Sequence, residues 1–298
     1  MISALIFCVA IPCIFMAMLV RSLEETAPHY PNYRGTSVYN GLGVVWFMWL
    51  LSLWAGAHLL VVTGSIQPNW MSYLLPIFPL IAGTCIFGLL DDWVGDQNAK
   101  GFRGHIGSLF RGVLTTGGTK LLAIGFLSLF TMISLYWGSW EHLTSDWAGI
   151  LLRITLGTCV IALMANTVNL FDLRPGRAGK VYALSLVLCL LAVGLGGIIV
   201  LDWPDIVALA LVGLGPLLAV WRYDIGERGM LGDAGANSKG AFLGYLLATA
   251  LPLPLLIGVT VALLVLNVAS ERFSFSEIIE GNRILKKLDG LGRKDIVE

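Results

Sequence analysis

Apolar residues occur along this chain in long continuous runs, separated by shorter polar segments. A helix that crosses a bilayer needs about 20 such residues. We expect seven spans, at residues 2–20, 42–63, 71–90, 121–138, 148–168, 181–201 and 205–221. The first is interpreted as a span rather than a cleaved signal, because no basic segment precedes it. The runs are continuous rather than alternating, so the pattern predicts membrane helices and not a β-barrel.

A further apolar stretch covers residues 240–268, which is too long for one upright span and short for two. Pro252 and Pro254 interrupt it, and a proline inside a helix removes a backbone hydrogen bond and kinks the chain. We therefore expect a hairpin of two short spans, or one broken helix. The pattern predicts an all-α polytopic membrane protein, with about eight to nine transmembrane helices in residues 1–270.

Composition and charge support this prediction and give it an orientation. The chain is 57% hydrophobic and 13% charged, whereas soluble domains carry about 25% charged residues. Its net charge is zero, so nothing attracts it broadly to nucleic acid. Of the 19 Lys and Arg residues, all but Arg153 lie in alternate connections or in the tail, in residues 21–34, 100–120, 174–180, 222–239 and 272–294. The positive-inside rule therefore places these segments in the cytoplasm and the N-terminus outside.

The tail, residues 271–298, is predicted to be a cytoplasmic, polar and partly amphipathic segment. Its apolar positions could lie against the membrane or against the protein body: Ile278, Ile279, Leu285, Leu288 and Leu291. Because the predicted cytoplasmic connections are long and the outer ones short, we expect the active face to be cytoplasmic.

The first candidate motif is the adjacent pair Asp91 and Asp92, near the end of the third predicted span. Carboxylates are costly near a bilayer and mark functional sites there. Neighbouring side chains on a helix point in different directions, so one carboxylate can face a metal while the other faces substrate or acts as a base. A span that simply ends in solvated acids would give the same pattern.

The second motif places Asn166, Asn169 and Asp172 at intervals of three residues, and therefore roughly on one helix face. The two amides can read a sugar or a base, and the carboxylate can bind a metal. Three cations follow, Arg174, Arg177 and Lys180, and they suit a pyrophosphate. Flanking charge of the positive-inside kind explains the cations, but it does not explain the asparagines.

The third motif is Gly232-Asp233-Ala234-Gly235. Its small residues allow the backbone to approach a ligand closely, and a helix N-terminus after it would favour anions. With this motif, four aspartates fall on one predicted membrane face: Asp91, Asp92, Asp172 and Asp233. We expect them to converge on one hard cation such as Mg²⁺, which takes oxygen ligands and commonly accompanies phosphates.

These segments, in this order, resemble the polyprenyl-phosphate N-acetylhexosamine-1-phosphate transferases. That family includes phospho-MurNAc-pentapeptide transferase and UDP-GlcNAc:undecaprenyl-phosphate GlcNAc-1-phosphate transferase. The resemblance covers about residues 1–270. Besides Asp91-Asp92 and Gly232-Asp233-Ala234-Gly235, it rests on Asn169-Leu170-Phe171-Asp172 and on an early loop, Pro31–Gly35, that leads to Gly41-Leu42-Gly43.

The resemblance implies transfer of a sugar-1-phosphate from a UDP-amino sugar to polyprenyl phosphate, with release of UMP, in a bacterial cytoplasmic membrane. It implies Mg²⁺, or Mn²⁺ in its place, held by Asp233 with Asp91 or Asp92, and it implies a homodimer. Asp91, Asp92 and Asp172 would be the catalytic residues. Substrate would be bound by Asn166, Asn169, Arg174, Arg177, Lys180, Lys120 and Arg34.

Several positions depart from the family pattern. Residues 270–293 hold no histidine, although the family usually has a His-rich loop there, and Tyr223 and Asp224 replace an asparagine. Ala236 stands where the family has serine. The alternative hypothesis is a non-catalytic relative that binds the lipid carrier or a partner protein. A transporter would require charged residues in the middle of its spans, and only Arg153 meets that description.

Overall fold

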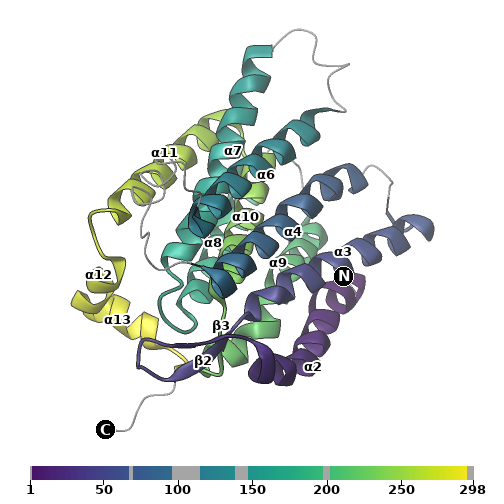
Figure 1. The fold of residues 1–298 in the computed structure, drawn as a ribbon. Helices are drawn as coiled ribbons and strands as arrows, with labels where there is room; N and C mark the ends of the chain where they lie inside the picture. The colour runs from purple at the N-terminus through teal and green to yellow at the C-terminus, as the bar shows by residue number, and fades with distance from the viewer. Residues whose placement is uncertain (1, 67–69, 96–114, 138–146, 197–201, 294–298) are drawn as a thin grey trace.

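The computed structural model describes residues 2–66, 70–95, 115–137, 147–196 and 202–293 (Figure 1). Eight of its helices are long and apolar enough to cross a membrane, so the predicted all-α polytopic membrane fold is confirmed. The predicted cytoplasmic cations Lys100, Arg103 and Arg111 lie outside the described residues, as do the last five residues of the tail. The side of the membrane that each end of the bundle faces stays a prediction.

The bundle is built from helices that follow one another along the chain. The first span is built from three consecutive segments, and the second begins with a short 3-10 turn. The elements in chain order are α1 (Ile2–Ala4), η1 (Leu5–Ala10), α2 (Ile11–Thr26), η2 (Leu42–Val44), α3 (Val45–Val62), α4 (Trp70–Val94), α6 (Thr116–Trp137), α7 (Trp147–Leu170), α8 (Arg177–Gly196), α9 (Trp203–Asp224), α10 (Gly232–Ala250), α11 (Leu253–Ser270), α12 (Phe275–Gly281) and α13 (Arg283–Gly290).

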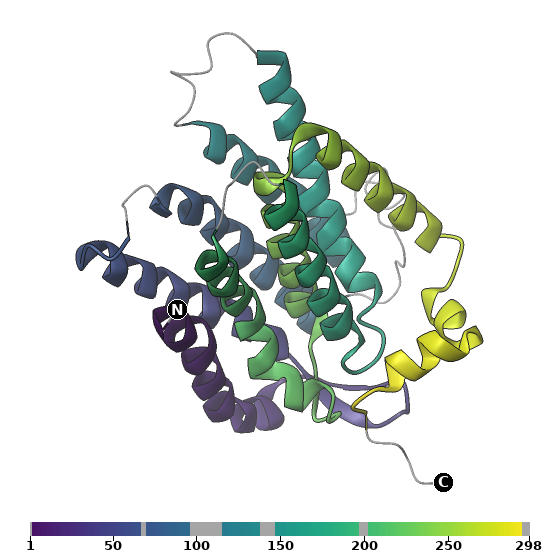
Figure 2. The ribbon, with the colours of Figure 1, turned by 180° about the vertical axis from the view of Figure 1, so that it is seen from behind.

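The apolar stretch 240–268 breaks at the predicted place. Helix α10 ends at Ala250, Leu251 and Pro252 are extended, and α11 begins at Leu253. Both helices pack on α7. Most residues of α10 are buried, whereas only Leu256 and Leu263 of α11 are, and both views place α11 at the edge of the bundle (Figures 1 and 2).

Small residues allow α10 to occupy the centre. A Cβ added at Gly240 would lie 2.3 Å from the backbone oxygen of Met164, and one added at Gly244 would lie 2.5 Å from the Cα of Ile161. Helix α10 therefore packs backbone to backbone on α7. Small residues are the usual means of such close packing in membranes, where lipid tails provide no hydrophobic drive for helices to associate.

Aromatic rings fix α10 against the neighbouring helices. Trp46 and Trp49 of α3 lie 6.1 Å and 5.4 Å from the ring of Phe242 in α10, centroid to centroid. Tyr182 of α8 lies 5.8 Å from Trp46 and donates a hydrogen bond to the Gly213 carbonyl of α9 at 2.7 Å. Since buried aromatic pairs add about 0.5–1.5 kcal/mol each beyond their burial, this cluster holds the position of α10.

A small sheet closes one end of the bundle (Figure 1). Strand β1 (His29–Pro31) pairs antiparallel with β2 (Ser37–Asn40), and β2 pairs in parallel with β3 (Gly229–Met230). In the second pairing Asn40 lies opposite Met230. The sheet therefore fastens the first connecting loop to the segment that leads directly into α10.

Candidate functional site

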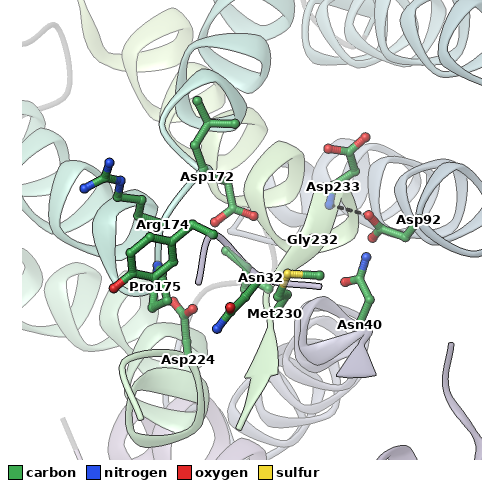
Figure 3. A pocket seen from close by; sticks show the side chains of 13 residues that line it. Asn32, Asn40, Asp92, Asp172, Arg174, Pro175, Asp224, Met230, Gly232 and Asp233 are labelled. Carbon is green, nitrogen blue, oxygen red and sulfur yellow. Dashed lines mark hydrogen bonds between the residues drawn. The ribbon is translucent and has the colours of Figure 1, made fainter. Parts of the chain in front are cut away.

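A cavity of about 220 Å³ opens at the end of the bundle that carries the sheet (Figure 3). It lies between the first loop and β2 on one side and the segments after α7 and α9 on the other. Three of the four predicted aspartates line it. The lining residues are Asn32, Tyr33, Asn40, Asp92, Asp172, Leu173, Arg174, Pro175, Asp224, Met230, Leu231, Gly232 and Asp233.

Asp91 and Asp233 share one cationic partner, Lys120. The Lys120 Nζ lies 2.7 Å from Asp91 Oδ2 and also forms an ion pair with Asp233 Oδ2. The three residues come from the end of α4, the beginning of α6 and the first turn of α10. Sequence analysis predicted that Lys120 binds substrate; the structure places it between two of the predicted metal ligands.

Asp92 caps the N-terminus of α10. Its carboxylate accepts hydrogen bonds from the backbone N–H groups of Asp233 at 2.8 Å and Ala234 at 3.1 Å. An acceptor at this position satisfies donors that have no partner within the helix, and its negative charge opposes the positive end of the helix dipole. Asp92 therefore fixes the place of Asp233 beside Asp91.

The glycines of this region are required by close contacts. Gly232 has φ +70°, and a Cβ there would lie 2.3 Å from Asn40 Oδ1 and 2.5 Å from Asp92 Oδ2. A Cβ at Gly88 of α4 would lie 2.5 Å from the backbone of Ala234. The motif at residues 232–235 thus acts by allowing α4 and β2 to approach the start of α10.

Asn40 is a site residue that sequence analysis missed. It is buried, and its Oδ1 makes no hydrogen bond to any described residue. An unsatisfied buried acceptor costs free energy of about 1–3 kcal/mol, so this oxygen is available to a ligand donor in the cavity. The position follows a tyrosine and precedes a glycine, and only the register of the sheet shows that it faces Asp92.

Asp172 lies across the cavity from Asp92 and Asp233, with Asp224 below it in the view (Figure 3). Burial raises the pKa of Asp172 well above its ordinary value, and the charge of Asp224 adds to that effect. Asp224 Oδ2 accepts a hydrogen bond from the backbone N–H of Gly176 at 3.2 Å. In the sequence Asp224 stands out only as a departure from the resemblance, whereas in the structure it lines the cavity.

Lys239 is the cation behind these two aspartates. It is fully buried in α10, interacts electrostatically with Asp224 and Asp172, and its Nζ makes no hydrogen bond to a described residue. The Nζ lies 6.0 Å from the centre of the Tyr182 ring. Helix α10 therefore presents Asp233 to one wall of the cavity and supports the opposite wall with Lys239.

Two of the predicted substrate ligands lie near the first loop. Arg174 lines the cavity, with its guanidinium 5.2 Å from the centre of the Tyr33 ring, and it also pairs with Glu280 of α12. Arg34 forms a salt bridge of 3.3 Å with Glu227. Both cations therefore already have carboxylate partners within the described structure.

Arg177 and Lys180 face the tail rather than the cavity. Arg177 Nε and Nη2 donate to the two oxygens of Asp289, each at 2.8 Å. Arg293 donates to the same carboxylate at 2.9 and 3.0 Å. Burial alone would raise the pKa of Asp289, but these hydrogen bonds lower it to about 2. Lys180 Nζ binds the backbone carbonyls of Leu288 and Asp289.

The two predicted amides lie on another helix face. Asn166 Nδ2 donates to Asn267 Oδ1 of α11 at 2.6 Å, and neither Asn166 nor Asn169 is among the residues that line the cavity. The spacing of three residues predicted one helix face for both amides and Asp172, but α7 ends at Leu170 and only Asp172 lines the cavity. It could not show that α11 would cover Asn166.

The prediction that four aspartates converge on one cation needs correction. Among the residues that the structure describes, no group of three or more His, Cys, Asp or Glu side chains could hold a metal ion. Asp92 uses its oxygens on backbone N–H groups, and Asp172 lies on the opposite wall. The physical reason is that a helix N-terminus and the Lys120 ammonium already satisfy most of this negative charge.

A smaller metal site still fits the donor chemistry. Asp91 Oδ2 and Asp233 Oδ2 both contact one ammonium nitrogen, which stands in for a cation between them. Mg²⁺ commonly binds to one or two carboxylates and completes its octahedron with water and substrate phosphate. Asp91 and Asp233 are the residues that would hold it.

Comparison of the chain with protein-family models and with curated proteins found no match to either.

Proposed function

We propose that this membrane protein transfers a sugar-1-phosphate, in our view an N-acetylhexosamine-1-phosphate, from a UDP-sugar to polyprenyl phosphate. The observation that carries the proposal is the pair Asp91 and Asp233. Both carboxylates contact the Lys120 ammonium beside a polar cavity. The proposed location is the cytoplasmic face of a bacterial cytoplasmic membrane, where cell-envelope glycan synthesis begins, and a homodimer is part of the proposal. Nucleic acid is not a partner.

The proposed reaction is one displacement at phosphorus. An oxygen of the lipid phosphate forms a bond to the β-phosphorus of the UDP-sugar, and the bond from that phosphorus to the bridging oxygen breaks. UMP leaves with the electron pair, and a lipid-pyrophosphate-sugar is formed. Bound Mg²⁺ would offset negative charge on the pyrophosphate. The second pKa of a phosphate monoester is about 6, so the attacking oxygen is largely ionised at neutral pH.

The residues of the cavity would then position the substrates. Arg174 can bind a phosphate in place of Glu280, since both oxyanions suit its guanidinium. Asn40 Oδ1 can accept a hydrogen bond from a sugar or base donor. Burial raises the pKa of Asp172, so its protonated form, which can donate a hydrogen bond to a phosphate oxygen, persists to higher pH than for an exposed aspartate.

The direction in which the rate changes with pH distinguishes two roles for Asp172. As a hydrogen-bond donor it must be protonated, so the rate should fall as pH rises through its raised pKa, and Asp172→Asn should retain activity and lose that fall. As a base it must be ionised, so the rate should rise with pH through the same region. The measurement is the initial rate of UMP release against pH for the two proteins.

The activity itself is tested by Mg²⁺-dependent UMP release from purified protein, given polyprenyl phosphate and a panel of UDP-amino sugars. Asp233→Asn should lower the rate by at least about a hundredfold, as expected when a charged group that stabilises the transition state is lost. The matched control is Asp205→Asn, the same substitution on an exposed aspartate at the far end of α9. Equal rates in both variants would remove Asp233 from the site.

A second candidate function is a non-catalytic relative that binds the lipid carrier or a partner protein. The observation in its favour is that described cations near the cavity already have carboxylate partners, Lys120 with Asp91 and Asp233, and Arg174 with Glu280. Protein that is folded and binds polyprenyl phosphate, but releases no UMP from any donor with either Mg²⁺ or Mn²⁺, would establish this alternative.

A further inference from the structure

The last helix, α13, is fastened to the beginning of a membrane span. Asp289 near its end receives four hydrogen bonds from Arg177 and Arg293, and Lys180 binds the carbonyls of Leu288 and Asp289. Arg177 is the first residue of the span α8, and Lys180 lies one turn further along it. These contacts hold α13 at the level of the first turn of a transmembrane helix, which is the depth of the membrane–water boundary.

The other side of α13 carries large apolar side chains that the rest of the protein leaves exposed. Ile284 is 72% exposed, Leu288 52% and Leu291 54%. Ile284 and Leu288 are four residues apart in α13 and therefore share one face, and Leu291 directly follows the end of the helix at Gly290. Ile278 of α12 is also exposed. A protein surface in water rarely shows such a run of large apolar residues unless something covers it.

The charges around this face are positive. Arg283, Lys286 and Lys287 are exposed on α13, and within the described part of the chain no ion pair includes any of them. The one acid of α13, Asp289, is neutralised by two arginines. An amphipathic helix with apolar residues on one face and basic residues beside them is typical of helices that lie in the interface of a bilayer containing anionic lipid.

We propose that α13 is an interfacial helix that lies on the membrane surface, with Ile284, Leu288 and Leu291 among the lipid headgroups and the three cations on anionic lipid phosphates. Helix α8 exposes Leu184, Leu188 and Leu191 beyond the turn that holds α13, and the tail directly follows the span α11. The occupant of this face is therefore the lipid in which the protein already lies.

The same tail reaches the wall of the cavity. Phe275 of α12 stacks on Phe171 with ring centres 5.2 Å apart, and Glu280 pairs with Arg174. Arg293 donates to the carbonyl of Pro175 at 2.8 Å. Contact of α13 with lipid would therefore hold the segment 171–175 in place from the membrane side, whatever reaction the cavity supports.

The test places an environment-sensitive nitrobenzoxadiazole fluorophore on full-length protein in lipid nanodiscs. Leu288→Cys and Lys286→Cys are labelled separately, and protein with only its five native cysteines, which lie within the spans, gives the background. We expect the label at 288 to emit at shorter wavelength and to be quenched by lipids that carry a nitroxide near the headgroup. We expect the label at 286 to be quenched by iodide in water.

The anionic component is tested with nanodiscs of phosphatidylcholine alone or with phosphatidylglycerol. Phosphatidylglycerol should increase quenching of the 288 label by lipid nitroxide, and Lys286→Gln together with Lys287→Gln should remove that increase. Each lost charge should lower the ratio of membrane-bound to unbound α13 about fivefold. Equal iodide access at 286 and 288 would overturn the proposal, as would protection of 288 that depends on two copies per disc and not on lipid. The readout does not depend on enzyme activity, so the proposed function can fail independently.

Discussion

Helices α10 and α11 follow each other in the chain and have nearly equal lengths, 19 and 18 residues, yet they occupy opposite environments. Helix α10 contains glycine, alanine, serine, asparagine and lysine, and nearly all of it is buried. Helix α11 is rich in leucine and valine, and most of it is open to lipid. In a bilayer the least apolar helix belongs at the centre, because other helices surround it there and can satisfy its polar groups.

The largest expected effect comes from removing the buried charge of α10. Lys239→Met leaves Asp172 and Asp224 without the cation that opposes them, and breaking a buried charge set in this way costs about 3–5 kcal/mol. The measurement is the free energy of unfolding in detergent, followed by denaturant titration. The control, Lys286→Met on the exposed face of α13, should change stability by less than about 0.5 kcal/mol. Similar values for both variants would mean that Lys239 has no such role.

A matched glycine pair tests the difference in packing. Gly240→Ala pushes a methyl group against the backbone of α7, with 2.3 Å to the Met164 oxygen, and should destabilise by about 1–3 kcal/mol. Gly258→Ala in α11 meets nothing within 4 Å and should be neutral or stabilise by up to about 1 kcal/mol, because alanine favours helix more than glycine does. The measurement is the shift in Tm of each variant on thermal unfolding. Equal shifts in Tm would contradict the central position of α10.

The smallest expected effect concerns the polar attachment of α11. Asn267 Oδ1 accepts a hydrogen bond from Asn166 Nδ2 at 2.6 Å, and Asn267 Nδ2 donates one to Thr167 Oγ1 at 2.9 Å. Asn267→Leu should cost about 1 kcal/mol, and combining it with Asn166→Leu should cost less than the sum of the two single changes. A double-mutant cycle on unfolding free energy measures this coupling. Strict additivity would show that the asparagines act separately and leave α11 held by apolar packing alone.

The sequence predicted the spans well because hydropathy reports the length of chain that lipid accepts. It placed the start of α8 at 181, whereas the helix begins at Arg177. The difference arises because Asp289 of the tail satisfies the charge of Arg177 at the boundary. It also left the start of α10 at 240, since residues 232–239 are too polar to be recognised as part of a buried helix.

The site was predicted in part. The position of Asp91 and Asp233 near the ends of apolar runs predicted that they lie on the same face, and in the structure both contact the Lys120 ammonium. Asn40 and Asp224 could not be found in this way, because the register of a three-stranded sheet and a turn at Gly176 place them in the cavity. Arg177 and Lys180 were predicted to bind substrate because no pattern in the sequence indicates that Asp289 of the tail is their partner.

The central claim is that Asp91 and Asp233 form a site for one divalent cation, and Mn²⁺ binding followed by electron paramagnetic resonance tests it most directly. The titration uses purified wild-type, Asp233→Asn and Asp205→Asn proteins, each with and without UMP. The predicted result is one Mn²⁺ per chain in the wild type and in Asp205→Asn, displaced by Mg²⁺ and lost in Asp233→Asn. No bound Mn²⁺ in the wild type, or equal binding in all three proteins, would contradict the claim and leave Lys120 as the permanent partner of these carboxylates.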